Sequence, residues 1–347
     1  MFNFSEYDNI YREKYLLFKS NIRKYLLIEN PERLFSELIN IPEQENHVIK
    51  NFDWNTEINI SQPSQCIYVT MHLGPYKTII ASIISNAINL CIPVTEYIYI
   101  NKKGEYMKGI ESIKEKVNGN ISIVNIETRE GLSQLIKNIR NGYSVLLYLD
   151  GNSGFGGMER DDDKLIKITF FKQTIYVRKG AYKLAHLLKL SIIPVVSFFN
   201  TQGTPQIEYL NDWKTDIINQ SEVDVMQQLW EIYEKYISLY KGQWEAWTYA
   251  NIYSREQDIS KNKKQNKNIS NTNLLIFNSQ RFDFIIDNDK YFIYDLLKNI
   301  KYKVPKTLFD FFNKINKEKI ILTKTAFFEI IKKENLAHDI LEKELLY

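Results

Sequence analysis

Short apolar runs and amphipathic stretches alternate along the chain between residues 65 and 199. Runs rich in Ile, Val and Tyr predict strands at 66–71, 94–99, 121–124, 144–149 and 191–199. Between them, apolar positions repeat at helical spacing and predict helices at 78–89, 106–117, 129–141 and 178–188. This alternation predicts an α/β fold with a mainly parallel central sheet flanked by helices. Ligands of such sheets bind beyond the carboxyl ends of the strands.

The pattern changes on the C-terminal side of this region. A helix is predicted at 223–240, a Trp-rich segment follows at 243–247, and residues 261–273 form a polar, Asn- and Lys-rich run typical of a linker. Beyond it we expect short strands at 274–277, 282–286 and 291–294, then helices at 305–316, 323–333 and 337–346. The sequence therefore predicts an α/β domain over 1–260, a linker over 261–273 and a small α+β domain over 274–347.

Near the N-terminus, apolar and aromatic residues recur at helical spacing between residues 10 and 28, with Arg and Lys residues between them. We interpret this segment as an amphipathic helix packed on its own domain; the alternative is a helix lying on an anionic membrane surface. Charged residues interrupt every apolar run, so neither a signal peptide nor a membrane span is expected. We expect a cytoplasmic protein, with peripheral contact to the inner face of the membrane as the alternative.

Composition excludes few classes of protein. The 347 residues are 44% hydrophobic and 25% charged, as in ordinary globular proteins, and a net charge of +3 gives no reason to expect a nucleic-acid partner. Cys66 and Cys91 lie in apolar segments, so we expect buried thiols of a reducing compartment. No His/Cys/Asp cluster has the spacing of metal ligands, and we expect no metal and no resident cofactor.

The most informative segment is 68–75, a short strand that ends in His72, Gly74 and Pro75 before an apolar helix. This arrangement exposes one imidazole at the edge of an α/β sheet. Imidazole can accept and return a proton near neutral pH, so His72 is the candidate general base.

Two further segments carry polar groups in comparable positions. The strand at 144–149 ends in Asp150, followed by Gly151, Asn152 and Ser153 in a Gly-rich turn. A basic helix start, Arg178 and Lys179 followed by Gly-Ala, precedes the strand with Ile193-Pro194-Val195. The alternative interpretation of each is structural: a turn capped by Asp150, and a solvated helix start.

Together these three blocks and the Gln243-Trp244-Glu245-Ala246-Trp247 segment resemble the lysophospholipid acyltransferase superfamily over residues 60–255. The nearer resemblance is to its lipid A lauroyl/myristoyl acyltransferase branch. It implies that an acceptor hydroxyl or amine attacks an acyl thioester of coenzyme A or acyl carrier protein, with His72 as base. It further implies substrate contacts at Gly74, Tyr76, Gly151, Asn152, Ser153, Arg178 and Lys179.

The sequence departs from the family pattern at two positions. Lys77 stands where the family has the carboxylate partner of the histidine, so we propose Asp150 as the acid that orients the ring and include Lys77 among the catalytic candidates. Ser153 stands where the family has an arginine, which makes a phosphorylated glycerol acceptor less favoured.

The segment 274–347 has a weaker resemblance, to PqqD-like winged-helix units, which capture leader peptides by strand addition. This implies a peptide acceptor in place of a lipid. The alternative function is accordingly a repurposed family member that binds or acts on a peptide or carrier protein in natural-product biosynthesis. An accessory domain that completes the fold is the structural interpretation of the same segment.

Overall fold

The computed structural model describes residues 9–28, 30–51, 65–111, 118–151, 165–210, 220–254, 273–279, 281–287, 289–296, 300–331, 340 and 345–346. The chain divides into two compact units. The first, which we call the α/β unit, is Pro31–Arg255. The second, the terminal unit, combines Met1–Asn30 with Glu256–Tyr347. The sequence had placed residues 1–30 in the α/β domain, whereas the structure groups them with the C-terminal part. The predicted linker, except Asn273, lies outside the described residues.

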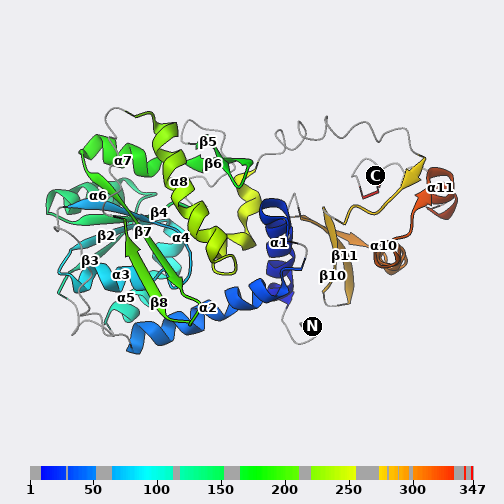
Figure 1. Cartoon of the computed structure of the whole chain (residues 1–347), viewed down its shortest axis with the longest axis horizontal. Helices are drawn as coiled ribbons and strands as arrows, with labels where there is room; N and C mark the ends of the chain where they lie inside the picture. Colours follow the sequence, from blue (N-terminus) through cyan, green and yellow to red (C-terminus); the bar gives the residue numbers. More distant parts are fainter. Residues whose placement is uncertain are drawn as a thin grey trace. The chain divides into compact units, whose positions relative to one another are not determined.

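A six-stranded sheet forms the centre of the α/β unit, in the order β3-β2-β4-β1-β7-β8. The paired strands run parallel except β8, which is antiparallel to β7. Their bounds are β1 Cys66–Thr70, β2 Leu90–Val94, β3 Ile121–Asn125, β4 Ser144–Tyr148, β7 Ser191–Phe199 and β8 Pro205–Tyr209. Helices flank this sheet (Figure 1), as the alternating pattern predicts.

The helices of the α/β unit differ in burial. They are α2 Glu32–Asn51, α3 Thr78–Ser85, α4 Glu96–Asn101, α5 Lys103–Glu111, α6 Arg129–Arg140, α7 Gly180–Leu188 and α8 Glu222–Leu239, with 3-10 turns η3 Glu245–Thr248 and η4 Ala250–Tyr253. Helix α3 is almost fully buried, whereas no residue of α4 is buried. Ile79, Ile83 and Ile84 of α3 are fully buried against Tyr68 of β1 and Leu146 of β4. Burial of a side chain of this size contributes about 2 kcal/mol. The central strands and α3 therefore make a rigid base for the loops that follow β1 and β4.

Two predictions for this unit are corrected. The strand expected at 94–99 is β2, which ends at Val94, followed by α4. Thr95 explains the change, because its hydroxyl accepts a hydrogen bond from the Ile98 N–H and so caps the helix that β-favouring residues then form. The antiparallel hairpin of β5 (Leu165–Phe170) and β6 (Gln173–Arg178) was not predicted, and α7 starts after it, at Gly180.

The terminal unit has a three-stranded antiparallel sheet, β10 (Phe282–Asp287), β11 (Lys290–Asp295) and β12 (Ile300–Val304). A short pair, β9 (Leu274–Leu275) and β13 (Leu322–Thr323), and helices α10 (Lys306–Glu318) and α11 (Lys324–Ile331) complete it. Phenylalanines dominate its core: Phe277, Phe282, Phe284, Phe309, Phe312 and Phe327. The helix expected at 337–346 lies mostly outside the described residues.

Helix α1 (Asn9–Leu26) contacts the small sheet of the terminal unit. The Arg12 guanidinium donates to the Phe284 carbonyl of β10 (3.2 Å), and Glu13 pairs with Lys301 of β12. Its apolar residues Phe18 and Ile22 are fully buried, so they are not exposed to a membrane surface in this structure. Among the described helices, none is long and apolar enough to cross a bilayer.

Candidate functional site

The candidate site lies where two neighbouring parallel strands end. β1 and β4 pair with Thr70 opposite Tyr148. His72 and Asp150 each follow two residues later, so both emerge at the same edge of the sheet. This edge is the carboxyl end of the parallel strands, where ligands of such sheets bind.

His72 and Asp150 form a hydrogen-bonded pair. The distance between His72 Nδ1 and Asp150 Oδ1 is 2.8 Å. An ionised carboxylate only accepts hydrogen bonds, so Nδ1 carries the proton and Nε2 of the neutral ring keeps a free lone pair. The His72 side chain is 23% exposed and that of Asp150 is fully buried. The structure thus brings together the two residues that the sequence suggested as base and orienting acid.

Asp150 is held by three donors. Besides the imidazole, the His72 backbone N–H (2.9 Å) and the Trp244 indole Nε1–H (2.8 Å) both donate to Asp150 Oδ2. The Tyr253 hydroxyl donates to the Asp150 carbonyl oxygen (2.6 Å). A buried carboxylate is costly unless its oxygens accept hydrogen bonds, and these donors supply them. The Trp-rich segment therefore orients the acid, and its Trp244 and Trp247 are also fully buried.

Two tyrosine rings enclose the imidazole. The Tyr148 ring stacks on His72 with ring centroids 4.6 Å apart, and the Tyr76 ring meets it edge-on at 4.7 Å. Contacts on a face and an edge restrict rotation of the ring about its bonds. They leave His72 oriented before any substrate binds.

The charge environment favours the protonated form of His72. Burial lowers its pKa, but the charge and the hydrogen bond of Asp150 raise it, and the Glu245 and Glu45 carboxylates add to that effect. The net result is a pKa above the usual 6.5. A base whose pKa lies close to the working pH is suited to proton transfer in both directions.

Gly74 is required by the backbone of the turn. Its φ is +55°, and a Cβ there would lie 2.6 Å from Phe198 Cα and 2.9 Å from the Ser197 carbonyl oxygen. Its N–H donates to the Gln243 carbonyl (2.9 Å), which ties the turn to the Trp-rich segment. Backbone geometry thus accounts for this glycine, and Tyr76 rather than Gly74 offers a side chain next to His72.

Lys77 lies against an acid that the sequence analysis did not identify. Its Nζ is 3.5 Å from Glu45 Oε2, and its backbone N–H donates to Glu45 Oε1 (2.7 Å). The Glu45 side chain, on α2, is 2% exposed and that of Lys77 is 28% exposed. From the sequence, Lys77 is a cation at the position of the family carboxylate. In the structure its ammonium lies against Glu45, and Asp150 accepts the hydrogen bond of the His72 Nδ1–H.

Three substrate contacts were predicted in the loop that follows β4, and the structure describes one of them. Gly151 follows Asp150 directly, and its N–H donates to the Tyr148 carbonyl (3.3 Å). Asn152 and Ser153 lie outside the described residues.

The two basic candidates lie between β6 and α7. Arg178 is the last residue of β6, and Lys179 is the N-cap of α7. Lys179 is largely buried, with its Nζ 2.5 Å from Glu222 Oε1 at the start of α8. This ion pair connects α7 to α8, which is a structural use of the Lys179 charge.

The other histidines have local partners. His47 contacts the Asn51 side chain (2.8 Å), His186 stacks on Tyr182, and His338 lies outside the described residues. Within the part of the chain that is described, no group of three or more His, Cys, Asp or Glu residues could hold a metal ion.

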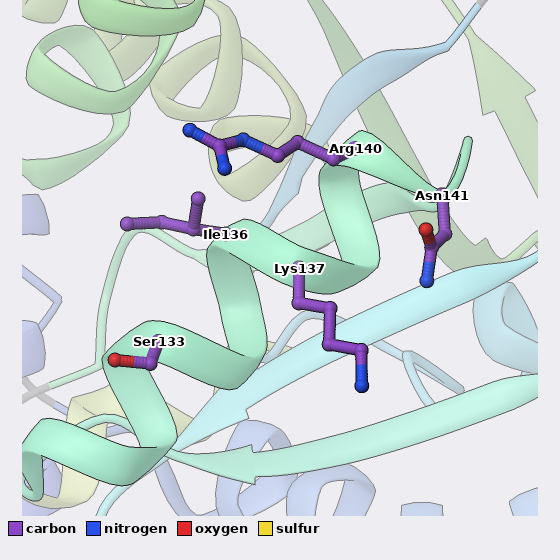
Figure 2. Close-up of a pocket in the computed structure, with 5 residues that line it drawn as sticks. All are labelled: Ser133, Ile136, Lys137, Arg140 and Asn141. Atoms are coloured by element: carbon purple, nitrogen blue, oxygen red, sulfur yellow. The ribbon is translucent and has the colours of Figure 1, made fainter.

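A separate pocket of about 420 Å³ lies on α6, with Arg140 and Lys137 among its lining residues (Figure 2). The other lining residues are Ser133, Ile136 and Asn141. No histidine, cysteine or carboxylate is among these side chains, so the pocket is no second candidate for acid–base chemistry.

Sequence reasoning missed four contributors to the site: Glu45, Tyr148, Tyr253 and the indole donor of Trp244. For Glu45 a signal was present, because Phe35, Leu38 and Ile41 predict the apolar side of a helix and Glu45 continues that side. The contacts of Tyr148 and Tyr253 depend on how segments far apart in the sequence meet.

No model of a known protein family matches the sequence, and no curated protein matches it.

Proposed function

We propose that the protein is an acyltransferase that moves an acyl group from a thioester of coenzyme A or acyl carrier protein to a hydroxyl or amine. The observation that carries this proposal is the His72–Asp150 pair, joined at 2.8 Å at the carboxyl edge of the sheet. A histidine oriented by a buried carboxylate is an arrangement that activates hydroxyl and amine nucleophiles. The four sequence blocks of the acyltransferase superfamily support the same assignment, with a related fold for the α/β unit.

In the proposed reaction, Nε2 of His72 accepts the proton of the acceptor as its oxygen or nitrogen attacks the thioester carbonyl. Asp150 stabilises the imidazolium through Nδ1–H. The tetrahedral intermediate then collapses, the C–S bond breaks, and the imidazolium returns the proton to the leaving thiolate. The products are the acylated acceptor and a free thiol, so base and acid are one residue acting in turn.

Thiol release tests the proposal. The full-length protein is incubated with palmitoyl-coenzyme A or palmitoyl acyl carrier protein and hydroxylamine as a small nucleophile, and free thiol is measured. We expect release above the uncatalysed rate, with His72→Ala reducing it to background and Asp150→Asn reducing it on the order of 10³-fold. The matched control is His186→Ala, because His186 is an exposed histidine with no contact to the site.

Rates of His72→Ala equal to those of the unchanged protein would remove His72 from the mechanism. Absence of release with both donors would contradict the proposed function itself.

A second function, recognition of a peptide, is supported by a groove in the terminal unit. The groove, about 820 Å³, runs along β12 and is lined by Lys301, Lys303, Phe311, Ile330 and Leu345 among others. Among the described strands, β12 is an edge strand of the small sheet, and its residues Lys301 to Val304 line this groove. An extended peptide with apolar and acidic side chains fits such an edge strand, because strand addition supplies backbone hydrogen bonds and Lys303 supplies charge, Lys301 being paired with Glu13.

Peptide binding is tested with fluorescein-labelled extended peptides of about 20 residues that combine acidic and apolar side chains. We expect saturable anisotropy changes with the full-length protein and an at least 10-fold weaker affinity for Lys303→Glu, because like charges then meet. Lys290→Glu is the control, since Lys290 is an exposed lysine of the same sheet that does not line the groove. Equal loss in both variants would indicate non-specific attraction and contradict binding along β12.

A further inference from the structure

Helix α2 brings a buried acid to the turn that carries the proposed base. Glu45 follows Phe35, Leu38 and Ile41 on the buried side of α2, and its side chain is 2% exposed. The segment it contacts, residues 72–77, begins with His72 and ends with Lys77. A carboxylate at such a position needs partners, and Lys77 supplies two of them.

The contacts between Glu45 and Lys77 hold the turn at its far end. The Lys77 N–H, at the N-cap of α3, has Glu45 Oε1 as its acceptor at 2.7 Å, and Lys77 itself makes no side-chain cap. The Lys77 ammonium lies 3.5 Å from the other oxygen. Asp150 holds the near end of the same turn through the His72 N–H. The segment from His72 to Lys77 is thus fixed by one buried carboxylate at each end.

We infer that Glu45 is a positioning residue of the proposed transferase: it cancels the charge of Lys77, so that a lysine in place of the family acid does not oppose formation of the His72 imidazolium. This inference rests on the proposed function for its role in catalysis. The charge arrangement itself can be measured without turnover.

The sign of the effect follows from the groups around the imidazole. Three carboxylates raise its pKa: Asp150 beyond β4, Glu245 in η3 and Glu45 on α2. The ammonium of Lys77, in the same turn as His72, lies 3.5 Å from Glu45 Oε2 and 5.9 Å from the centre of the Tyr76 ring, which contacts the imidazole edge-on. Each carboxylate stabilises the imidazolium, and an unmatched ammonium destabilises it. Removal of the Glu45 charge alone leaves Lys77 unmatched and lowers the pKa of His72. Removal of both charges restores a value near the original.

Glu45 titrates near neutral pH. Burial raises the pKa of Glu45 to about 7, Lys77 opposes that rise, and Glu245 adds to it. Since protonation of Glu45 leaves Lys77 unmatched, it disfavours protonation of His72. The two groups therefore titrate as a coupled pair, with a His72 curve broader than that of an isolated imidazole.

The test is NMR titration of the four histidines in the full-length protein, labelled with ¹⁵N-histidine, with His72 identified by the signal lost in His72→Gln. In Glu45→Gln, which keeps an acceptor for the Lys77 N–H, we expect the His72 midpoint to fall by about 0.5 unit or more. In Glu45→Gln/Lys77→Met and in the single variant Lys77→Met we expect a His72 midpoint within about 0.2 pH unit of the original. The double variant has lost both charges, and in the single variant Glu45 becomes neutral without Lys77. The acid limb of the thiol-release rate should shift in the same directions.

The outcomes separate the two proposals. Two outcomes overturn the role of Glu45 even if thiol is released. In one, the His72 midpoint is unchanged in Glu45→Gln. In the other, it falls in Glu45→Gln and stays low when Lys77→Met is added. The expected midpoints without any thiol release would support the charge pair and contradict the transferase. Circular dichroism of each variant identifies a misfolded protein, and Lys77→Met provides the second measurement if Glu45→Gln does not fold.

Discussion

At the scale of single residues, the proposed mechanism depends on two carboxylates from different elements. Asp150 accepts a hydrogen bond from Nδ1–H of His72, and Glu45 lies 3.5 Å from the ammonium of Lys77. An acid at position 77 would combine proximity to the ring with attachment to the same turn. Here each acid comes from a different element, so the charge balance around His72 depends on the packing of α2 and of the Trp-rich segment.

Gly74 offers a test of how tightly the turn is built. We expect Gly74→Ala to lower the free energy of unfolding by about 3 kcal/mol, because a Cβ adds a clash with β7 to the cost of a positive φ. Gly142→Ala is the control: its φ is +85°, yet a Cβ there meets nothing within 4 Å. We expect about 1 kcal/mol for this variant, from the backbone alone. Urea denaturation measures both, and equal losses would show that the turn can move away from β7.

At the scale of elements, the sequence predicts best where burial is uniform. β1 and β4 are short apolar strands, and their parallel alternation with helices places His72 and Asp150 on one edge without any knowledge of contacts. The strand predicted at 94–99 was wrong. Tyr and Ile favour strands, but the pairing of β2 ends at Val94 and Thr95 caps a helix, so the segment forms α4. Local composition does not show at which residue a strand stops pairing with the neighbouring strand.

The site shows the same division between local and long-range information. The pairing of His72 with Asp150 follows from strand order, since both residues end neighbouring parallel strands. The partner of Lys77 does not, because Glu45 lies 32 positions earlier on a helix whose packing direction is set by the whole fold. Helical periodicity marks Glu45 as an acid on an apolar side, which indicates a buried partner but does not identify it.

At the scale of the whole molecule, both ends of the chain contribute to one compact unit. Residues Met1–Asn30 and Glu256–Tyr347 form the terminal unit, and the α/β unit lies between these two segments in the sequence. Helix α1 joins it through Arg12 to β10 and through Glu13 to β12, and it buries Phe18 completely. A change in α1 should therefore affect strands that lie 272 to 288 positions later in the sequence rather than the segments that follow it directly.

Phe18→Ala tests this connection in the full-length protein. Loss of a fully buried phenylalanine costs about 3–4 kcal/mol, and we expect that cost to fall on the terminal unit. Hydrogen exchange should then speed up in β10 and α10 while β1 and β4 keep their protection, because units with separate cores can open separately. The matched control is Phe35→Ala in α2, a phenylalanine that is 2% exposed and belongs to the α/β unit, for which we expect the reverse pattern.

Faster exchange in β1 and β4 on loss of Phe18 would contradict the assignment of α1 to the terminal unit. It would also mean that the His72 edge depends on the N-terminal helix, since β1 and β4 position both members of the pair.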